Sequence, residues 1–278
     1  MEKKLHQSED SHIIPMTSVS SGKLREAAPD VAYFTDQIAN VVFIGLPSGK
    51  WVLVDAGMPG SGKGIIHAAQ QRFGENNAPQ AILLTHGHFD HIGSITSLLE
   101  AWPGIPVYAH EAEFPFLTGK QAYPEPDPSA EGGLLAKISK IYPYKPIDIE
   151  PVLRALPEGG AVPMLEGWKW IPTPGHTPGH VSFFRKADRF LIAGDAFITV
   201  KQDSFYKVLI QKAEVNGPPV YFTPDWIAAE ASVKLLNELK PQVAVTGHGT
   251  HMEGRELQEG LELLANDFRY LAVPENKE

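Results

Sequence analysis

The stretch Thr85-His-Gly-His-Phe-Asp-His91 decides how this chain is interpreted. It follows a short apolar run that we expect to form a buried strand. His86 and His88 alternate at the end of that strand, so both rings can point the same way. Asp90 and His91 follow where a helix is expected to begin. Three imidazoles and one carboxylate this close together suit zinc, iron or manganese, so the stretch predicts a metal site.

Three later residues belong to the same pattern, because each follows a predicted strand or opens a loop beside one. His176 lies in a Pro-Gly-His-Thr-Pro-Gly-His loop between two expected strands. Asp195 comes directly after a buried strand, where a carboxylate is costly unless it meets a cation. His248 follows another strand in a Val-Thr-Gly-His-Gly segment. We therefore expect these side chains to gather at the edges of sheets.

Composition narrows the class of protein. The chain has 278 residues, with 24 Lys and Arg against 33 Asp and Glu, and a net charge of -9. This acidic balance argues against binding to a nucleic-acid backbone. No apolar run is long enough to cross a bilayer, so we expect no membrane association. The chain holds no cysteine, which excludes a disulfide scaffold, a thiol nucleophile and a thiolate metal ligand.

The chain is predicted to form one metal-binding domain over residues 31–278, preceded by a loose arm over residues 1–30. Strands and helices alternate at first, which indicates an α/β fold. Two irregular stretches, at about 112–165 and 199–222, are rich in proline or aromatic residues and are predicted to act as lid-like insertions. The first residues contain no apolar segment of the kind found in a secretory signal, so we expect a cytoplasmic protein.

Taken together, the motifs resemble those of the metallo-β-lactamase superfamily, in its dinuclear hydrolase branch. The resemblance covers roughly residues 31–273. It implies a four-layer αββα sandwich and two divalent metal ions per chain. Carried over by motif, the first metal would be held by His86, His88 and His176, and the second by Asp90, His91 and His248. Asp195 would bridge the two metals, and Asp55 would support the site from behind.

The resemblance also implies a mechanism. A hydroxide held between the two metals would attack the substrate, while one metal would polarise the substrate's carbonyl or phosphoryl oxygen. Asp90 is the candidate to pass a proton to the leaving group. Zinc is the first expectation, but a ligand set of nitrogen and oxygen atoms also accepts iron, manganese or cobalt.

Several other features are interpreted without a catalytic role. The segment Gly57-Met-Pro-Gly-Ser-Gly-Lys-Gly64 nearly spells a phosphate-binding loop but ends in glycine where a hydroxyl is required, so we interpret it as a flexible turn. His180 is predicted to be a structural hydrogen-bonding residue. His110 is expected at a solvated strand end, and His251 is at best a substrate contact.

The substrate is predicted to be a small molecule with an ester-like bond, a lactone or carboxylic ester first. The lack of cysteine removes the cysteine-ligated β-lactamase subtypes. The alternatives are a thioester hydrolase of the glyoxalase II type, a β-lactamase-like or phosphoester hydrolase, and a mononuclear iron persulfide dioxygenase. The dioxygenase would use only part of the ligand set, and the presence of Asp90, His91 and His248 argues against it. The oligomeric state is not predicted.

Overall fold

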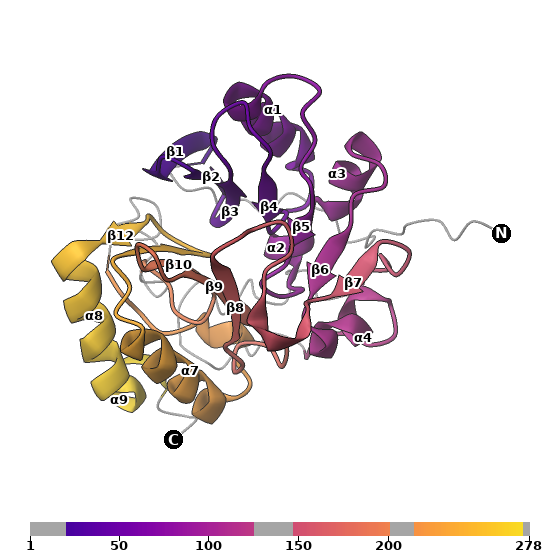
Figure 1. Ribbon diagram of the computed structural model, residues 1–278. Coiled ribbons are helices and arrows are strands. Elements are labelled where there is room, and N and C mark those ends of the chain that lie inside the picture. The colour runs from indigo at the N-terminus through magenta and orange to yellow at the C-terminus, as the bar shows by residue number, and fades with distance from the viewer. Residues whose placement is uncertain (1–20, 125–146, 201–213, 275–278) are drawn as a thin grey trace. The chain divides into compact units, whose positions relative to one another are not determined.

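The computed structural model (Figure 1) shows a mixed α/β protein whose chain divides into two compact units. The structure describes residues 21–124, 147–200 and 214–274. Within these, the first unit comprises residues 21–123, 147–158 and 163–165, and the second comprises residues 159–162, 166–200 and 214–274. Each unit holds one sheet and the helices that pack on it.

The first unit is built on a seven-stranded sheet in which the strands follow one another in chain order. The first four strands are antiparallel, and from the fourth strand on the neighbours are parallel. A parallel neighbour needs a crossover, and the helices of this unit supply the connections. The strands are β1 (Lys23–Ala28), β2 (Val31–Asp36), β3 (Ala39–Ile44), β4 (Val52–Val54), β5 (Ile82–Leu83), β6 (Val107–Ala109) and β7 (Leu153–Ala155).

Helices of the first unit cover one face of this sheet. They are α1 (Gly62–Phe73), α2 (Phe89–Ile92), α3 (Ile95–Ala101), the short 3₁₀ helix η1 (Glu111–Glu113) and α4 (Phe114–Leu117). In α1 the residues Ile65, Ala69 and Phe73 recur at helical spacing and are buried. They join Phe43 and Trp51 in one apolar core, where the rings of Trp51 and Phe73 stack with centroids 4.5 Å apart. This core fixes the strands whose ends carry the candidate ligands.

The second unit is built on a five-stranded sheet with the order β12-β11-β10-β9-β8. Only β10 and β11 are parallel neighbours; the other pairs are antiparallel. The strands β8, β10 and β11 consequently run in the same direction. The bounds are β8 (Trp168–Pro172), β9 (Val181–Arg185), β10 (Phe190–Gly194), β11 (Val243–Thr246) and β12 (Met252–Glu253).

Three helices pack on the second sheet: α7 (Trp226–Glu238), α8 (Gly254–Asn266) and α9 (Phe268–Ala272). Leu257, Leu261 and Leu264 line the buried face of α8 and contact the same core as Val233 of α7. Two 3₁₀ turns, η3 (Glu158–Gly160) and η4 (Val220–Phe222), complete the described elements. Among the described residues, no helix has the length and apolar character needed to cross a membrane.

The structure differs from the sequence prediction at several elements. Residues 23–28, expected in a loose arm, form the edge strand β1, whose charged and small residues show no apolar pattern in the sequence. In the sequence, Thr223 followed by Pro224 favours Thr223 as the N-cap of a helix. The helix instead begins at Trp226, because the Asp225 carboxylate accepts the Ala228 amide (2.9 Å) and is the N-cap. Residues 1–20 of the predicted arm lie outside the described residues, as do residues 125–146 and 201–213 of the two predicted lids.

Candidate metal centre

In the first unit, the candidate ligands and the carboxylates that support them lie at or near the carboxyl ends of parallel strands. Asp55 follows β4, the Thr85–His91 stretch follows β5, and Glu113 lies shortly after β6. The carboxyl ends of parallel neighbours meet at one edge of a sheet, so the topology brings these segments together. The stretch from His88 to His91 enters α2, which places Asp90 and His91 in one helical turn.

Asp55 organises this edge through three hydrogen bonds. Its Oδ1 accepts the backbone N–H of Thr85 (2.8 Å), and its Oδ2 accepts the Thr85 hydroxyl (2.8 Å) and Nδ1–H of His91 (2.9 Å). The residue has a left-handed backbone with φ of 63°, a conformation that aspartate tolerates better than most residues. Because the Thr85 proton points at Asp55, the Thr85 oxygen accepts Nδ1–H of His86 (3.0 Å).

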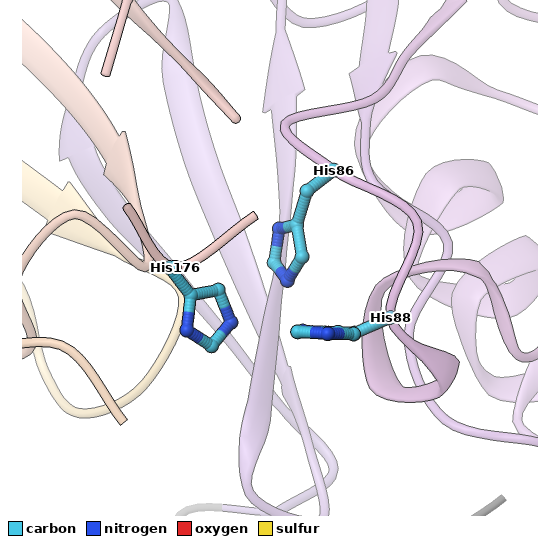
Figure 2. Close-up of side chains that lie close together, drawn as sticks. All are labelled: His86, His88 and His176. Atoms are coloured by element: carbon cyan, nitrogen blue, oxygen red, sulfur yellow. The ribbon is translucent and has the colours of Figure 1, made fainter. Parts of the chain in front are cut away.

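These contacts select the tautomer of two buried histidines. With Nδ1 protonated in both His86 and His91, each ring carries its lone pair on Nε2, the form in which histidine binds a metal. The two ring centroids lie 4.2 Å apart. Figure 2 shows the rings of His86 and His88, which lie nearly perpendicular with centroids 4.8 Å apart. Asp90 completes the group, with its Oδ2 at 3.9 Å from Nε2 of His91.

A second buried carboxylate contacts the middle of the ligand stretch. Glu113 accepts the Gly87 amide (2.9 Å) and the Tyr123 hydroxyl, and the Gly87 amide also lies 3.1 Å from the Tyr123 oxygen. Burial and the negative charge of Glu113 raise the pKa of Tyr123 well above its ordinary value, so the phenol stays protonated and donates. The centroids of the Tyr123 and His88 rings lie 4.5 Å apart.

The glycine-rich segment at 57–64 is tied to the protein rather than open for a ligand. Its Met58 amide donates to Oδ2 of Asp36 (2.8 Å), and its Ser61 amide donates to the hydroxyl of Ser94 (2.9 Å). Ser94 in turn donates to the Met58 carbonyl (2.6 Å). The amides of Met58 and Ser61 are thus already used, and the segment fastens the end of α2. The interpretation as a flexible turn is corrected accordingly.

The second unit carries the other three candidate ligands, again at one sheet edge. The loop holding His176 follows β8, Asp195 follows β10, and His248 follows β11. These strands run in the same direction, so their ends lie together. One carboxylate oxygen, Oδ2 of Asp195, lies 3.4 Å from Nε2 of His176 and 3.1 Å from Nε2 of His248.

The surroundings of His176 point to a cation. The Thr223 hydroxyl donates to the Pro219 carbonyl (2.7 Å), so its oxygen accepts Nδ1–H of His176 (3.1 Å). Nε2 of His176 then carries a lone pair that faces the negative oxygen of Asp195. Two electron-rich atoms this close in a buried place are stabilised by a positive charge between them.

His180 and Thr199 hold the backbone around these ligands. Nε2 of His180 accepts the Asp195 amide (2.9 Å), and its Nδ1 donates to the Thr173 carbonyl (3.1 Å), which confirms the predicted structural role. The Thr199 amide donates to the His248 carbonyl (3.1 Å). Elsewhere, His110 accepts the Ala112 amide at the start of η1 (3.2 Å), and His251 is half-buried.

The donor set of each unit fits a divalent metal. All seven predicted ligands are buried, and the set combines neutral imidazoles with carboxylates, the ligands that zinc and iron prefer without thiolate. The ligands are His86, His88, Asp90, His91, His176, Asp195 and His248. The hydrogen bonds to Nδ1 of His86, His91 and His176 are the orienting contacts that metal-binding histidines usually make.

Sequence reasoning did not identify the residues that orient the ligands, apart from Asp55 and His180. Thr85 lies inside the motif, but its role depends on where its proton points. Glu113, Tyr123 and Thr223 are distant in sequence from the ligands that they contact. The burial of Glu113 is the signal that could have identified its role, because glutamate is rarely buried without a function. That burial is known only from the structure.

Comparison with known proteins agrees with this geometry. The family model "Metallo-beta-lactamase superfamily" matches residues 34–248. The chain is 52% identical to "Probable metallo-hydrolase YflN" of Bacillus subtilis (strain 168), over 91% of this chain and 96% of that protein. It is 46% identical to a hydroxyacylglutathione hydrolase of Xylella fastidiosa (strain M12), over 23% of this chain and 22% of that protein.

Among solved structures, the protein TTHA1623 in a di-iron-bound form is similar, with a TM-score of 0.50 and 28% identity over 82% of this chain and 92% of that chain. The family model reaches from within β2 of the first sheet to His248, two residues after β11 of the second sheet. The chain therefore belongs to the metallo-β-lactamase superfamily, has the family's α/β fold and is a metallo-hydrolase.

Proposed function

We propose that the chain is a dinuclear metal-dependent hydrolase of a small ester-like substrate, with a lactone or carboxylic ester as the first choice. The observation that carries this proposal is the ligand set: all seven family ligand positions are occupied by histidine or aspartate, and none is lost. The di-iron form of TTHA1623 supports two metals rather than one.

The seven ligands are assigned to two metals. We assign His86, His88 and His176, the side chains drawn in Figure 2, to the first metal. We assign Asp90, His91 and His248 to the second metal and Asp195 to both. Bound divalent cations supply two things to a hydrolase: a water activated as a nucleophile near neutral pH, and polarisation of the scissile carbonyl. Zinc is the first choice, and iron, manganese or cobalt fit the same donors.

The residues of the chain have separate tasks in this scheme. Asp55, Thr85 and Thr223 keep Nε2 of the histidines unprotonated and aimed. Burial of the ligands excludes competing water and strengthens each electrostatic contact. Asp90 is the carboxylate that does not bridge, and it would pass a proton to the leaving group.

An alternative substrate class has a specific observation in its favour. The local similarity to a hydroxyacylglutathione hydrolase favours a thioester of the glyoxalase II type as the second candidate. A cytoplasmic location fits either substrate.

The test is proton release by the metal-loaded protein against a panel of lactones, carboxylic esters, thioesters, β-lactams and phosphodiesters. Each hydrolysis acidifies a weak buffer, so one signal compares the classes. We expect release on lactones or carboxylic esters that a chelator abolishes and that H248A reduces. Release on thioesters or phosphodiesters alone would overturn the substrate class. Silence across the panel with one iron bound per chain would favour the persulfide dioxygenase instead.

A further inference from the structure

The loop that carries His86 and His88 contacts two carboxylates, Asp55 and Glu113. Asp55 accepts hydrogen bonds from Thr85 and His91, at the two ends of the ligand stretch. Neither contact reaches the middle of the stretch, where Gly87 separates the two histidines. There the Gly87 amide donates to Glu113 (2.9 Å), from the segment that follows β6.

Tyr123 connects this carboxylate to the ring of His88. Its hydroxyl donates to Glu113, and its oxygen lies 3.1 Å from the Gly87 amide. Its ring packs against His88, at 4.5 Å between centroids, and stacks on Phe116, at 3.9 Å between centroids and 11° between planes. The ring is thus held in place by Phe116 and by the Glu113 contact together.

The fit around Gly87 is tight. A Cβ at this position would lie 2.6 Å from the Tyr123 oxygen and 3.1 Å from a methyl group of Leu117. Only glycine lets the backbone approach the Glu113–Tyr123 pair this closely. Glu113 itself is fully buried, where a carboxylate is retained at a cost and its hydrogen bonds fix its orientation.

We propose that Glu113 and Tyr123 are positioning residues of the metal centre: the pair fixes the Gly87 backbone and the ring of His88 for the first metal. This inference rests on the proposed function. Neither side chain is placed among the ligands or next to the reacting atoms. They act through the ligand loop, as orienting partners of metal ligands do, whose loss typically costs about 10- to 100-fold in metal affinity.

The test measures the affinity of the full-length, metal-depleted protein for Co²⁺ by competition with a chelator, together with the visible absorption of bound Co²⁺. The first comparison is E113L against E113Q. Leucine removes the acceptor, whereas the glutamine oxygen can still accept from Gly87 and Tyr123. We expect E113L to bind Co²⁺ about 10- to 100-fold more weakly with an altered spectrum, and E113Q to restore both.

The second comparison is Y123F, which keeps the packing on His88 and Phe116 and removes only the hydroxyl. We expect about tenfold weaker binding. Matched controls are E259Q and Y270F, because Glu259 and Tyr270 are exposed on α8 and α9 and should leave the affinity and spectrum unchanged. If E113L does not fold, Y123F decides the test.

Three results would overturn the inference: a folded E113L with wild-type affinity, an E113Q as impaired as E113L, or a Y123F with wild-type affinity. A wild-type chain that binds no Co²⁺ would instead overturn the proposed function. The two failures are distinguishable because the first leaves metal binding and hydrolysis by the wild-type protein intact.

Discussion

Asp55 is the single residue on which most of the ligand geometry in the first unit depends. Its two oxygens accept three hydrogen bonds, two from Thr85 and one from His91. In D55N, the amide nitrogen must replace one oxygen and place a donor against a donor. We expect metal affinity to fall about 10- to 100-fold, measured by chelator competition. D188N, at an exposed ion pair with Arg185, is the matched control, and equal affinities in the two variants would contradict the role of Asp55.

Asp36 gives a prediction about pH. Burial raises the pKa of its carboxyl above the ordinary value of 3.8, against the smaller opposing effects of hydrogen bonds from Ser61 and Met58. The folded state therefore holds this proton more tightly than the unfolded state. The contribution of protonated Asp36 to the free energy of unfolding is fully present below the pKa of the unfolded state. It is lost as pH rises through the pKa of the folded state.

The variant D36N removes the charge and keeps an oxygen for the Met58 amide. We expect D36N to gain stability relative to the wild type as pH rises from about 4 to about 7. Urea unfolding of both proteins at several pH values measures the difference between their free energies of unfolding. The effects of the other carboxyl groups cancel in this difference, because both proteins contain them. A difference that stays constant, or falls with pH, would show that the Asp36 charge is not destabilising.

Two glycine-to-alanine substitutions in the helices of the first unit are expected to have opposite effects on stability. A Cβ on Gly93, between α2 and α3, would lie 2.3 Å from the Pro59 nitrogen, although its backbone is helical. A Cβ on Gly64 within α1 would meet only Phe34, at 3.4 Å. We expect G93A to lose about 1–3 kcal/mol by overpacking. We expect G64A to gain up to about 1 kcal/mol from helix propensity.

Denaturant unfolding of both variants checks this pair. G93A should also weaken metal binding, because the glycine-rich segment fastens the end of α2 through Ser94. G64A should leave metal binding unchanged. If G93A proves as stable as the wild type, the contact between Gly93 and Pro59 does not hold α2.

The elements differed in how far the sequence could predict them. The apolar runs at 41–44 and 189–192 predict strands that agree with β3 and β10 within a residue or two, because burial on both faces leaves a clear signal. Apolar residues at helical spacing from Ile92 to Trp102 predict one helix, but it is interrupted at Gly93 and Ser94, where contacts with a distant loop decide the break. The strand β1 was missed because an edge strand with half-exposed charges has no apolar pattern.

The candidate ligands could all be proposed from the sequence, since each is a chemically distinctive residue that follows a predicted strand. Their orientation was not. The tautomers of His86 and His176 depend on Thr85 and Thr223, whose hydroxyl directions follow from contacts with Asp55 and Pro219. Such contacts join residues far apart in the chain, and no spacing rule in one sequence predicts them.

At the level of the whole chain, bound metal should stabilise the folded protein. Metal at about 100 times its Kd adds about 2.7 kcal/mol to the free energy of unfolding. We expect a chelator to lower the melting temperature, and added metal to restore it. H86A and H176A should each reduce this metal-dependent shift. A shift of wild-type size in both variants would contradict the assignment of His86 and His176 to a metal.

The most direct test of the dinuclear proposal is the number of metal ions per chain, measured by elemental analysis after dialysis, in the wild type and in H248A. We expect two divalent ions per wild-type chain, and a lower number in H248A, which lacks a ligand of the second metal. A single iron per chain, unchanged in H248A, would contradict the proposal and favour a mononuclear site.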